Sequence, residues 1–185
     1  MRFACCLPAQ HTVSFKIVVN FDYFTVMAYI AVSPSLLCGL ALCYYDLRTR
    51  TVPRIWVCIG VLVQLVVFLS TTVMPAFHAG SATLPRLAMT LLLASISVSV
   101  QLALALCKPG ALGLGDVTCT GLIALAVGWF GLLTIVTWWV FMGFIGLFWM
   151  LAWPRFPHND TAYASRVPFV PVIVTAAFCA LLITA

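Results

Sequence analysis

Six apolar blocks separated by short polar segments constrain the fold of this chain more than any other feature. The blocks span residues 24–45, 55–74, 87–106, 117–127, 132–153 and 168–185. A helix that crosses about 30 Å of hydrocarbon needs about 20 apolar residues. Only 7% of the residues are charged, whereas a soluble domain has roughly 25%. The sequence therefore predicts an all-α fold, a polytopic transmembrane helical bundle of about six spans.

The chain is expected to comprise a short N-terminal tail and one transmembrane domain. In residues 1–23, Pro8 and Lys16 interrupt any continuous apolar run, so this segment is not a good secretory signal. We expect a tail that is in part an interfacial helix. Residues 24–185 contain no repeat and no linker, so they are predicted to form a single domain in the lipid bilayer.

The net charge of +5 bears on orientation rather than on nucleic-acid binding. The Lys and Arg residues form no basic stripe and no nucleic-acid motif, so no nucleic-acid partner is expected. With the N-terminus outside, the inward segments hold Arg48, Arg50, Arg54, Lys108, Arg155 and Arg166, and the outward segments hold Arg2, Lys16 and Arg86. The positive-inside rule favours this orientation in the plasma membrane.

Cysteine and histidine residues form no pattern typical of a metal site. The eight cysteines include no C-x-x-C pair, and most lie within or beside apolar blocks, where cysteine packs as a small hydrophobe. His11, His78 and His158 lie in separate polar segments, with no H-E-x-x-H motif. The sequence therefore predicts no metal and no cofactor, and it argues against a zinc protease.

Two of the four acidic residues stand where an apolar block meets a polar segment. Asp46 closes the first block and Asp116 opens the fourth, whereas Asp22 and Asp160 lie in polar surroundings. Ionisable groups at such depths are costly and suggest function. For either residue alone, an ordinary interfacial aspartate is an equally good interpretation.

The residues around each acid favour a functional interpretation. A D-x-R-x-x-x-V-P string runs from Asp46 to Pro53, and a G-L-G-D string runs from Gly113 to Asp116. Glycines permit close backbone approach, which would let an extended substrate strand lie beside the carboxylate. If the N-terminus is outside, both acids lie at the cytoplasmic face.

In this order and on these helices, the two strings resemble those of the type IV prepilin peptidases. A V-P-F-V-P stretch from Val167 also looks like that family's closing I-P-F-x-P segment, and the resemblance covers about residues 36–180. It implies a membrane aspartic endopeptidase with Asp46 and Asp116 as its catalytic pair. It also implies prepilin-like substrates, with a short basic leader followed by an apolar helix.

Three features depart from the family's usual pattern. Thr118 stands where members usually have Lys, and Arg54 stands where Asn commonly follows the I-P pair. Both departures bear on substrate positioning rather than on the carboxylate chemistry. The longer members carry an N-terminal cysteine-motif domain linked to methylation. The sequence has no such motif, so we expect the short form, without methyltransferase activity.

The implied mechanism activates water with two carboxylates that share one proton. Two carboxylates close together do not both ionise cheaply. The ionised member would take a proton from the attacking water, and the protonated member would hydrogen-bond the scissile carbonyl. Asp116 opens a helix and Asp46 ends one, so helix dipoles would bias the charge towards Asp116.

An alternative function without peptide cleavage uses the same two acids. Asp46 and Asp116 would then form the proton relay of a proton-coupled transporter. The chain could also be a non-catalytic subunit of a pilus or secretion assembly, which the departure at Thr118 allows.

Overall fold

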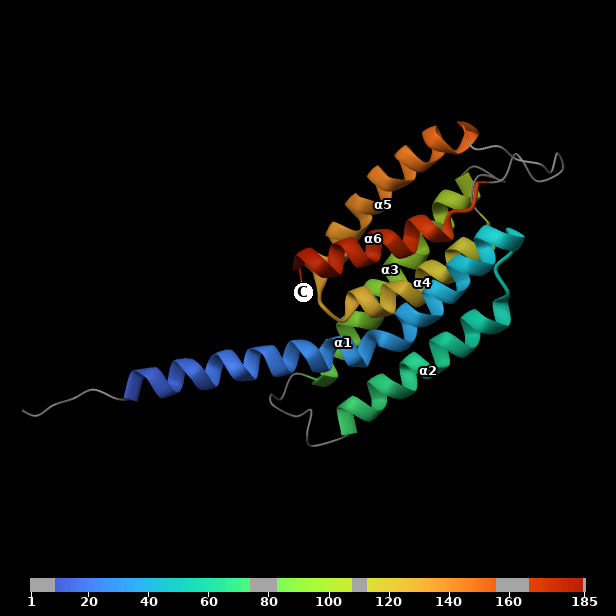
Figure 1. The fold of residues 1–185 in the computed structure, drawn as a ribbon. Coiled ribbons are helices and arrows are strands. Elements are labelled where there is room, and N and C mark those ends of the chain that lie inside the picture. Colours follow the sequence, from blue (N-terminus) through green and yellow to red (C-terminus); the bar gives the residue numbers. More distant parts are fainter. Residues whose placement is uncertain (1–8, 74–82, 108–112, 156–166, 185) are drawn as a thin grey trace, which may run out of the picture. The chain divides into compact units, whose positions relative to one another are not determined.

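A computed structural model of the chain describes residues 9–73, 83–107, 113–155 and 167–184. Its helices are α1 (Ala9–Thr49), α2 (Arg54–Val73), α3 (Thr83–Cys107), α4 (Leu114–Gly128), α5 (Leu132–Ala152) and α6 (Val170–Thr184), with a short 3-10 turn, η2 (Trp153–Arg155), after α5 (Figure 1). The described residues contain no strand. The prediction of an all-helical membrane bundle of about six spans is confirmed.

The chain divides into two compact units, Met1–Ile30 and Ala31–Ala185. The first unit contains the N-terminal part of α1. The second contains the rest of α1, all the other described helices, and both predicted catalytic residues, Asp46 and Asp116. The second unit is therefore the one that carries the candidate site.

Four helical segments are long and apolar enough to cross a membrane. These segments are Thr25–Thr49, Arg54–Thr72, Leu84–Cys107 and Leu132–Ala152. The two remaining helices, α4 and α6, have 15 residues each, which corresponds to a length of about 22 Å. Two of the six predicted spans are therefore shorter than a full crossing.

The short helix α4 lies at the centre of the bundle. Ten of its 15 residues are buried, and it packs against α2, α3, α5 and α6. A Cβ added at Gly39 of α1 would lie 2.6 Å from Ile123 Cδ1, so α1 also packs closely on α4. A helix that is apolar all round is buried. Here α4 is surrounded mainly by other helices.

Gln64 of α2 joins two backbone groups of α1. Its Oε1 accepts a hydrogen bond from the Ser35 N–H at 3.0 Å, and its Nε2 donates to the Ala31 carbonyl at 2.7 Å. Pro34 lies inside α1 between these two groups and has no N–H to donate within the helix. The buried Gln64 amide thus satisfies both groups at the proline.

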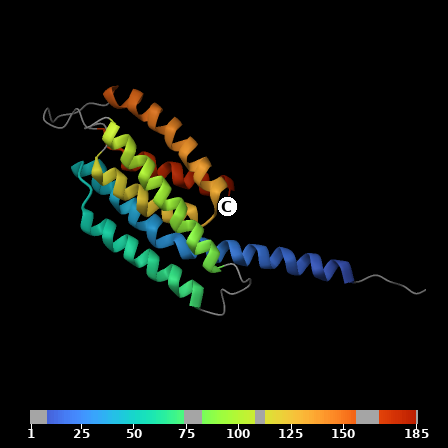
Figure 2. The ribbon, with the colours of Figure 1, turned by 180° about the vertical axis from the view of Figure 1, so that it is seen from behind.

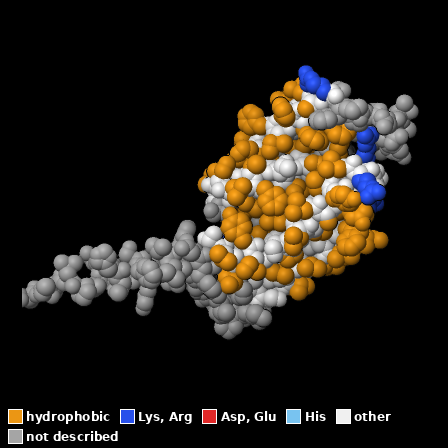
Figure 3. All heavy atoms as spheres, viewed as in Figure 1, with side chains coloured by type: hydrophobic (Ala, Val, Ile, Leu, Met, Phe, Trp, Pro, Cys, Tyr) orange, Lys and Arg blue, Asp and Glu red, His pale blue; other side chains and the backbone are white. Residues whose placement is uncertain are grey.

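The outer helices expose large apolar side chains, as a lipid-facing surface requires. Figure 3 shows apolar side chains over most of one face of the described part. Leu62 of α2 is 63% exposed, and Phe144 and Phe148 of α5 are 70% and 71% exposed. In water, an apolar patch of this extent would be unusual.

The two ends of the bundle differ in charge. The C-terminal ends of α1, α3 and α5 and the first residues of α2, α4 and α6 gather at one end (Figures 1 and 2). We call it the Asp46 end. Of the five Lys and Arg side chains that the structure describes, Arg48, Arg50, Arg54 and Arg155 lie at this end, and Arg86 lies at the other.

Candidate active site

Asp46 lies in the last turn of α1 and is only 5% exposed. Its Oδ2 accepts a hydrogen bond from the backbone N–H of Val170 at 3.2 Å, across 124 positions of sequence. Val170 is the first residue of α6. The partner of this buried carboxylate therefore comes from another helix, far along the chain.

The first turn of α6 explains why the Val170 N–H faces Asp46. Pro171 has no N–H. The N–H groups of Val172 and Ile173 both donate to the Phe169 carbonyl, at 3.0 and 3.2 Å. Of the backbone donors at this helix start, Val170 is thus the one directed at the carboxylate.

The N-terminus of α6 alters the expected division of charge between the two acids. A helix N-terminus carries partial positive charge and favours an anion. Asp46 ends its own helix but lies at the N-terminus of α6, and Asp116 lies at the N-terminus of α4. The N-terminus of α6 therefore offsets the C-terminal end of α1 at Asp46 and weakens the expected dipole bias towards charge on Asp116. The sequence did not predict that the Val170 N–H would bind Asp46. Its only indication was the V-P-F-V-P stretch, which contains Val170.

Asp116 is half-buried in the first turn of α4 and is held by its own loop. Its Oδ2 accepts the Gly113 N–H at 3.0 Å, and its own N–H donates to the Gly113 carbonyl at 3.0 Å. Both partners lie three residues away. The G-L-G-D string therefore places its own carboxylate.

The two sequence motifs pack against each other at Gly115. A Cβ added there would lie 2.8 Å from Val52 Cβ, closer than real Cβ contacts come. The space at the Cβ position of this glycine is occupied by the Val52 side chain of the first motif. Gly115 thus serves to bring the segment after α1 against the start of α4.

The two carboxylates lie within range of electrostatic interaction with each other. The charge of Asp46 acts on Asp116, and the charges of both act on the Cys119 thiol. Cys119 lies one helical turn after Asp116 and is completely buried. The fold thus brings together two acids that are 70 positions apart in sequence.

The arginines that follow Asp46 have neighbours of their own. Arg48 donates to the Tyr44 hydroxyl at 2.9 Å. Arg50 has a positive φ of 53°, and its guanidinium carbon lies 5.6 Å from the centre of the Trp153 ring. The charge of Arg50 also acts on Asp46. Of these two cations, Arg50 is therefore the one that both contacts η2 and acts on Asp46.

The two positions that depart from the expected pattern both lie at the Asp46 end of the bundle. Thr118 is exposed, and its hydroxyl donates to the Gly115 carbonyl at 2.9 Å. Arg54 is exposed at the first residue of α2. Among the described residues, no group of three or more His, Cys, Asp or Glu side chains has the arrangement of a metal site.

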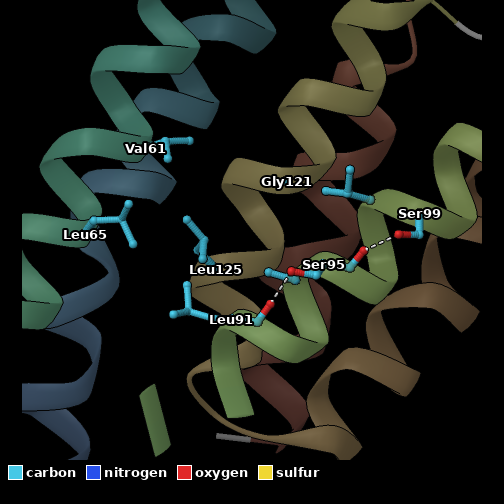
Figure 4. A pocket seen from close by; sticks show the side chains of 9 residues that line it. Val61, Leu65, Leu91, Ser95, Ser99, Gly121 and Leu125 are labelled. Carbon is cyan, nitrogen blue, oxygen red and sulfur yellow. Dashed lines mark hydrogen bonds between the residues drawn. The ribbon is translucent and has the colours of Figure 1, made fainter. Parts of the chain in front are cut away.

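A separate groove of about 410 Å³ lies between α2, α3 and α4 (Figure 4). It is lined by Val61, Leu65, Leu91, Ala94, Ser95, Val98, Ser99, Gly121 and Leu125. The hydroxyls of Ser95 and Ser99 donate to carbonyls of their own helix at 2.7 and 2.8 Å. Its lining carries no ionisable group, so the chemistry of this groove differs from that around the aspartates.

Comparison with known proteins identifies a family. A model of the type IV leader peptidase family matches residues 35–150, a range that contains both Asp46 and Asp116. The matched range ends before α6, which supplies the hydrogen-bond donor to Asp46. No curated protein and no solved structure matches the chain.

Proposed function

The chain belongs to the type IV leader peptidase family, and from that premise we propose that it is an aspartic endopeptidase in which Asp46 and Asp116 form the catalytic pair. The main support is that these two acids, one from each motif, meet at the same end of the bundle within electrostatic range. The packing of Val52 on Gly115 supports the same pairing.

In the proposed mechanism, the pair holds one proton between its two carboxyl groups. The ionised group takes a proton from water as that water attacks the scissile carbonyl. The protonated group hydrogen-bonds the carbonyl oxygen, and a proton then passes to the leaving amine. Each acid accepts one backbone N–H at a helix N-terminus. Those contacts single out neither group, so the proton is best assigned to the pair.

The proposed substrates are prepilin-like proteins, cut between a short basic leader and a following apolar helix. The family supports leader peptides as the substrate class. We place the cleavage at the cytoplasmic face. Four of the five described basic side chains lie at the Asp46 end, and positively charged segments favour that side of the membrane.

Co-expression with a candidate prepilin tests this proposal. The wild-type chain should shorten the prepilin, and Asp46→Asn or Asp116→Asn should each lower the cleavage rate by about 10³-fold or more. Asp160→Asn is the matched control, since this acid lies in a polar segment, and it should cleave normally. Proton-coupled uptake without any shortened product would instead favour a transporter.

A further inference from the structure

The segment that delivers the Val170 N–H to Asp46 is held from the other side by a tryptophan of α5. The indole Nε1 of Trp149 donates to the Pro168 carbonyl at 3.0 Å. Pro168 lies two residues before Val170, whose N–H reaches the Asp46 carboxylate at 3.2 Å. The start of α6 is therefore fixed between an indole donor and a carboxylate acceptor.

Three further contacts close this arrangement into a loop of contacts that returns to Asp46. The rings of Trp149 and Trp153 lie with their centres 5.6 Å apart, and the Arg50 guanidinium carbon lies 5.6 Å from the centre of the Trp153 ring. The backbone N–H of Arg50 donates to the Asp46 carbonyl at 2.8 Å. Asp46 is thus linked to α6 through its side chain. It is linked to Trp149 of α5 through its backbone carbonyl, by way of Arg50 and Trp153.

Apolar packing holds the body of α6 in place but does not orient the Pro168 carbonyl that precedes it. Phe169 packs so closely on α5 that a Cβ added at Gly146 would lie 3.2 Å from its ring. Val170, Val172 and Ile173 are buried. Apolar packing is non-directional, whereas the indole hydrogen bond fixes the direction of the Pro168 peptide.

We propose that Trp149 is a positioning residue for Asp46: by holding the Pro168 carbonyl, it directs the Val170 N–H at the carboxylate. The effect on catalysis rests on the proposed function, in which Asp46 is one of the catalytic acids. The structural link between Trp149 and Val170 does not rest on it. A small displacement of a catalytic group costs rate even when the fold is intact.

The test compares Trp149→Phe with Trp138→Phe. Phenylalanine keeps an aromatic ring at each position, and it removes the indole donor together with part of the ring volume, a loss that both variants share. Trp138 is a matched control because its Nε1 also donates from α5 to a carbonyl of α6, that of Ile173, at 3.0 Å. Trp138 is fully buried whereas Trp149 is partly exposed. A merely structural role would therefore make Trp138→Phe the more damaging change.

With purified protein and a prepilin substrate, Trp149→Phe should lower kcat by about tenfold, the loss expected for one directed hydrogen bond, and leave KM within about twofold. Trp138→Phe should lower the unfolding temperature more but kcat by less than about twofold. An equal fall in kcat for both variants would overturn the proposal.

Val170→Pro provides a second variant that removes the donor itself. Proline is well tolerated at the first position of a helix, so α6 should still form. This variant should lose about as much kcat as Trp149→Phe, and the double variant should lose no more, because both changes act on one hydrogen bond. If the losses in kcat multiply in the double variant, the two changes do not act through the same hydrogen bond, and the proposal is contradicted.

Amide hydrogen exchange at Val170 tests the link without any substrate. Exchange should be at least about fivefold faster in Trp149→Phe than in the wild type and unchanged in Trp138→Phe. Unchanged exchange in Trp149→Phe would overturn the positioning role. If the wild type cleaves no prepilin, the proposed function fails, and this measurement still decides whether Trp149 holds the Val170 N–H.

Discussion

Asp46 and Asp116 carry the same functional group at the same end of the bundle, but they are held in opposite ways. Asp116 is fixed by Gly113, three residues before it. Asp46 is fixed by Val170, 124 positions after it. One carboxylate therefore depends on its own loop, and the other depends on how separate helices pack. The two acids should respond differently to changes placed elsewhere in the chain.

The largest expected effect on stability comes from Gln64, which supports the helix of Asp46 and not that of Asp116. In Gln64→Leu, the Ser35 N–H and the Ala31 carbonyl lose their partner in a buried position. We expect the free energy of unfolding to fall by about 2–4 kcal/mol. Denaturant titration in detergent micelles measures this loss.

The control for Gln64 is Ser70→Ala on the same helix. The Ser70 hydroxyl donates to the Val66 carbonyl of its own helix and is exposed. Its removal should change stability by less than about 0.5 kcal/mol. A loss of similar size in both variants would show that Gln64 does not support α1 in the way described.

The next largest effect concerns the loop that holds Asp116, at the two glycines before that residue. Gly115→Ala puts a Cβ 2.8 Å from Val52 Cβ, whereas Gly113→Ala makes an ordinary contact of 3.4 Å at a φ of −79° that any residue adopts. Gly115→Ala should destabilise the protein by about 1–3 kcal/mol. Gly113→Ala should be nearly neutral. Thermal unfolding of both variants gives the difference.

A second change that removes the clash between the new methyl group and Val52 would test this explanation. Val52→Gly in the Gly115→Ala chain removes the side chain that the new methyl group meets. It should therefore cost less than the sum of the two single losses. Additive losses would mean that the two motifs do not depend on this contact.

The smallest expected effect lies at the opposite end of the bundle. Arg86 donates from Nε to the Trp129 carbonyl at 2.8 Å, and its guanidinium carbon lies 5.0 Å from the Trp129 ring centre. Arg86→Gln should cost about 1 kcal/mol of stability and leave cleavage unchanged. A loss of cleavage with an intact fold would break the separation between the two ends.

The sequence predicted the parts of the site that depend on neighbouring residues. The apolar blocks placed the helices, and the G-L-G-D string placed Asp116 at the start of α4. Periodicity and capping are local properties, so a single sequence carries them. The all-helical fold and the family were predicted for this reason. The catalytic roles of Asp46 and Asp116 stay predictions.

The parts that the sequence did not predict are contacts between distant helices. Nothing near Asp46 indicates that Val170 will donate to it, and nothing near Gln64 indicates that it will join two groups beside Pro34. The contact between Gly115 and Val52 was not predicted either, because Val52 lies on another segment. Such contacts depend on packing angles between helices, which hydrophobic patterns constrain only loosely.

The central claim is that Asp46 and Asp116 act as one unit on one water molecule. Single-turnover cleavage of a prepilin by the wild type, Asp46→Asn, Asp116→Asn and the double variant tests it directly. We predict that each single change lowers the rate by about 10³-fold or more, and that the double variant is no slower than the slower single variant. A single variant within about tenfold of the wild type, or losses that multiply in the double variant, would contradict the account.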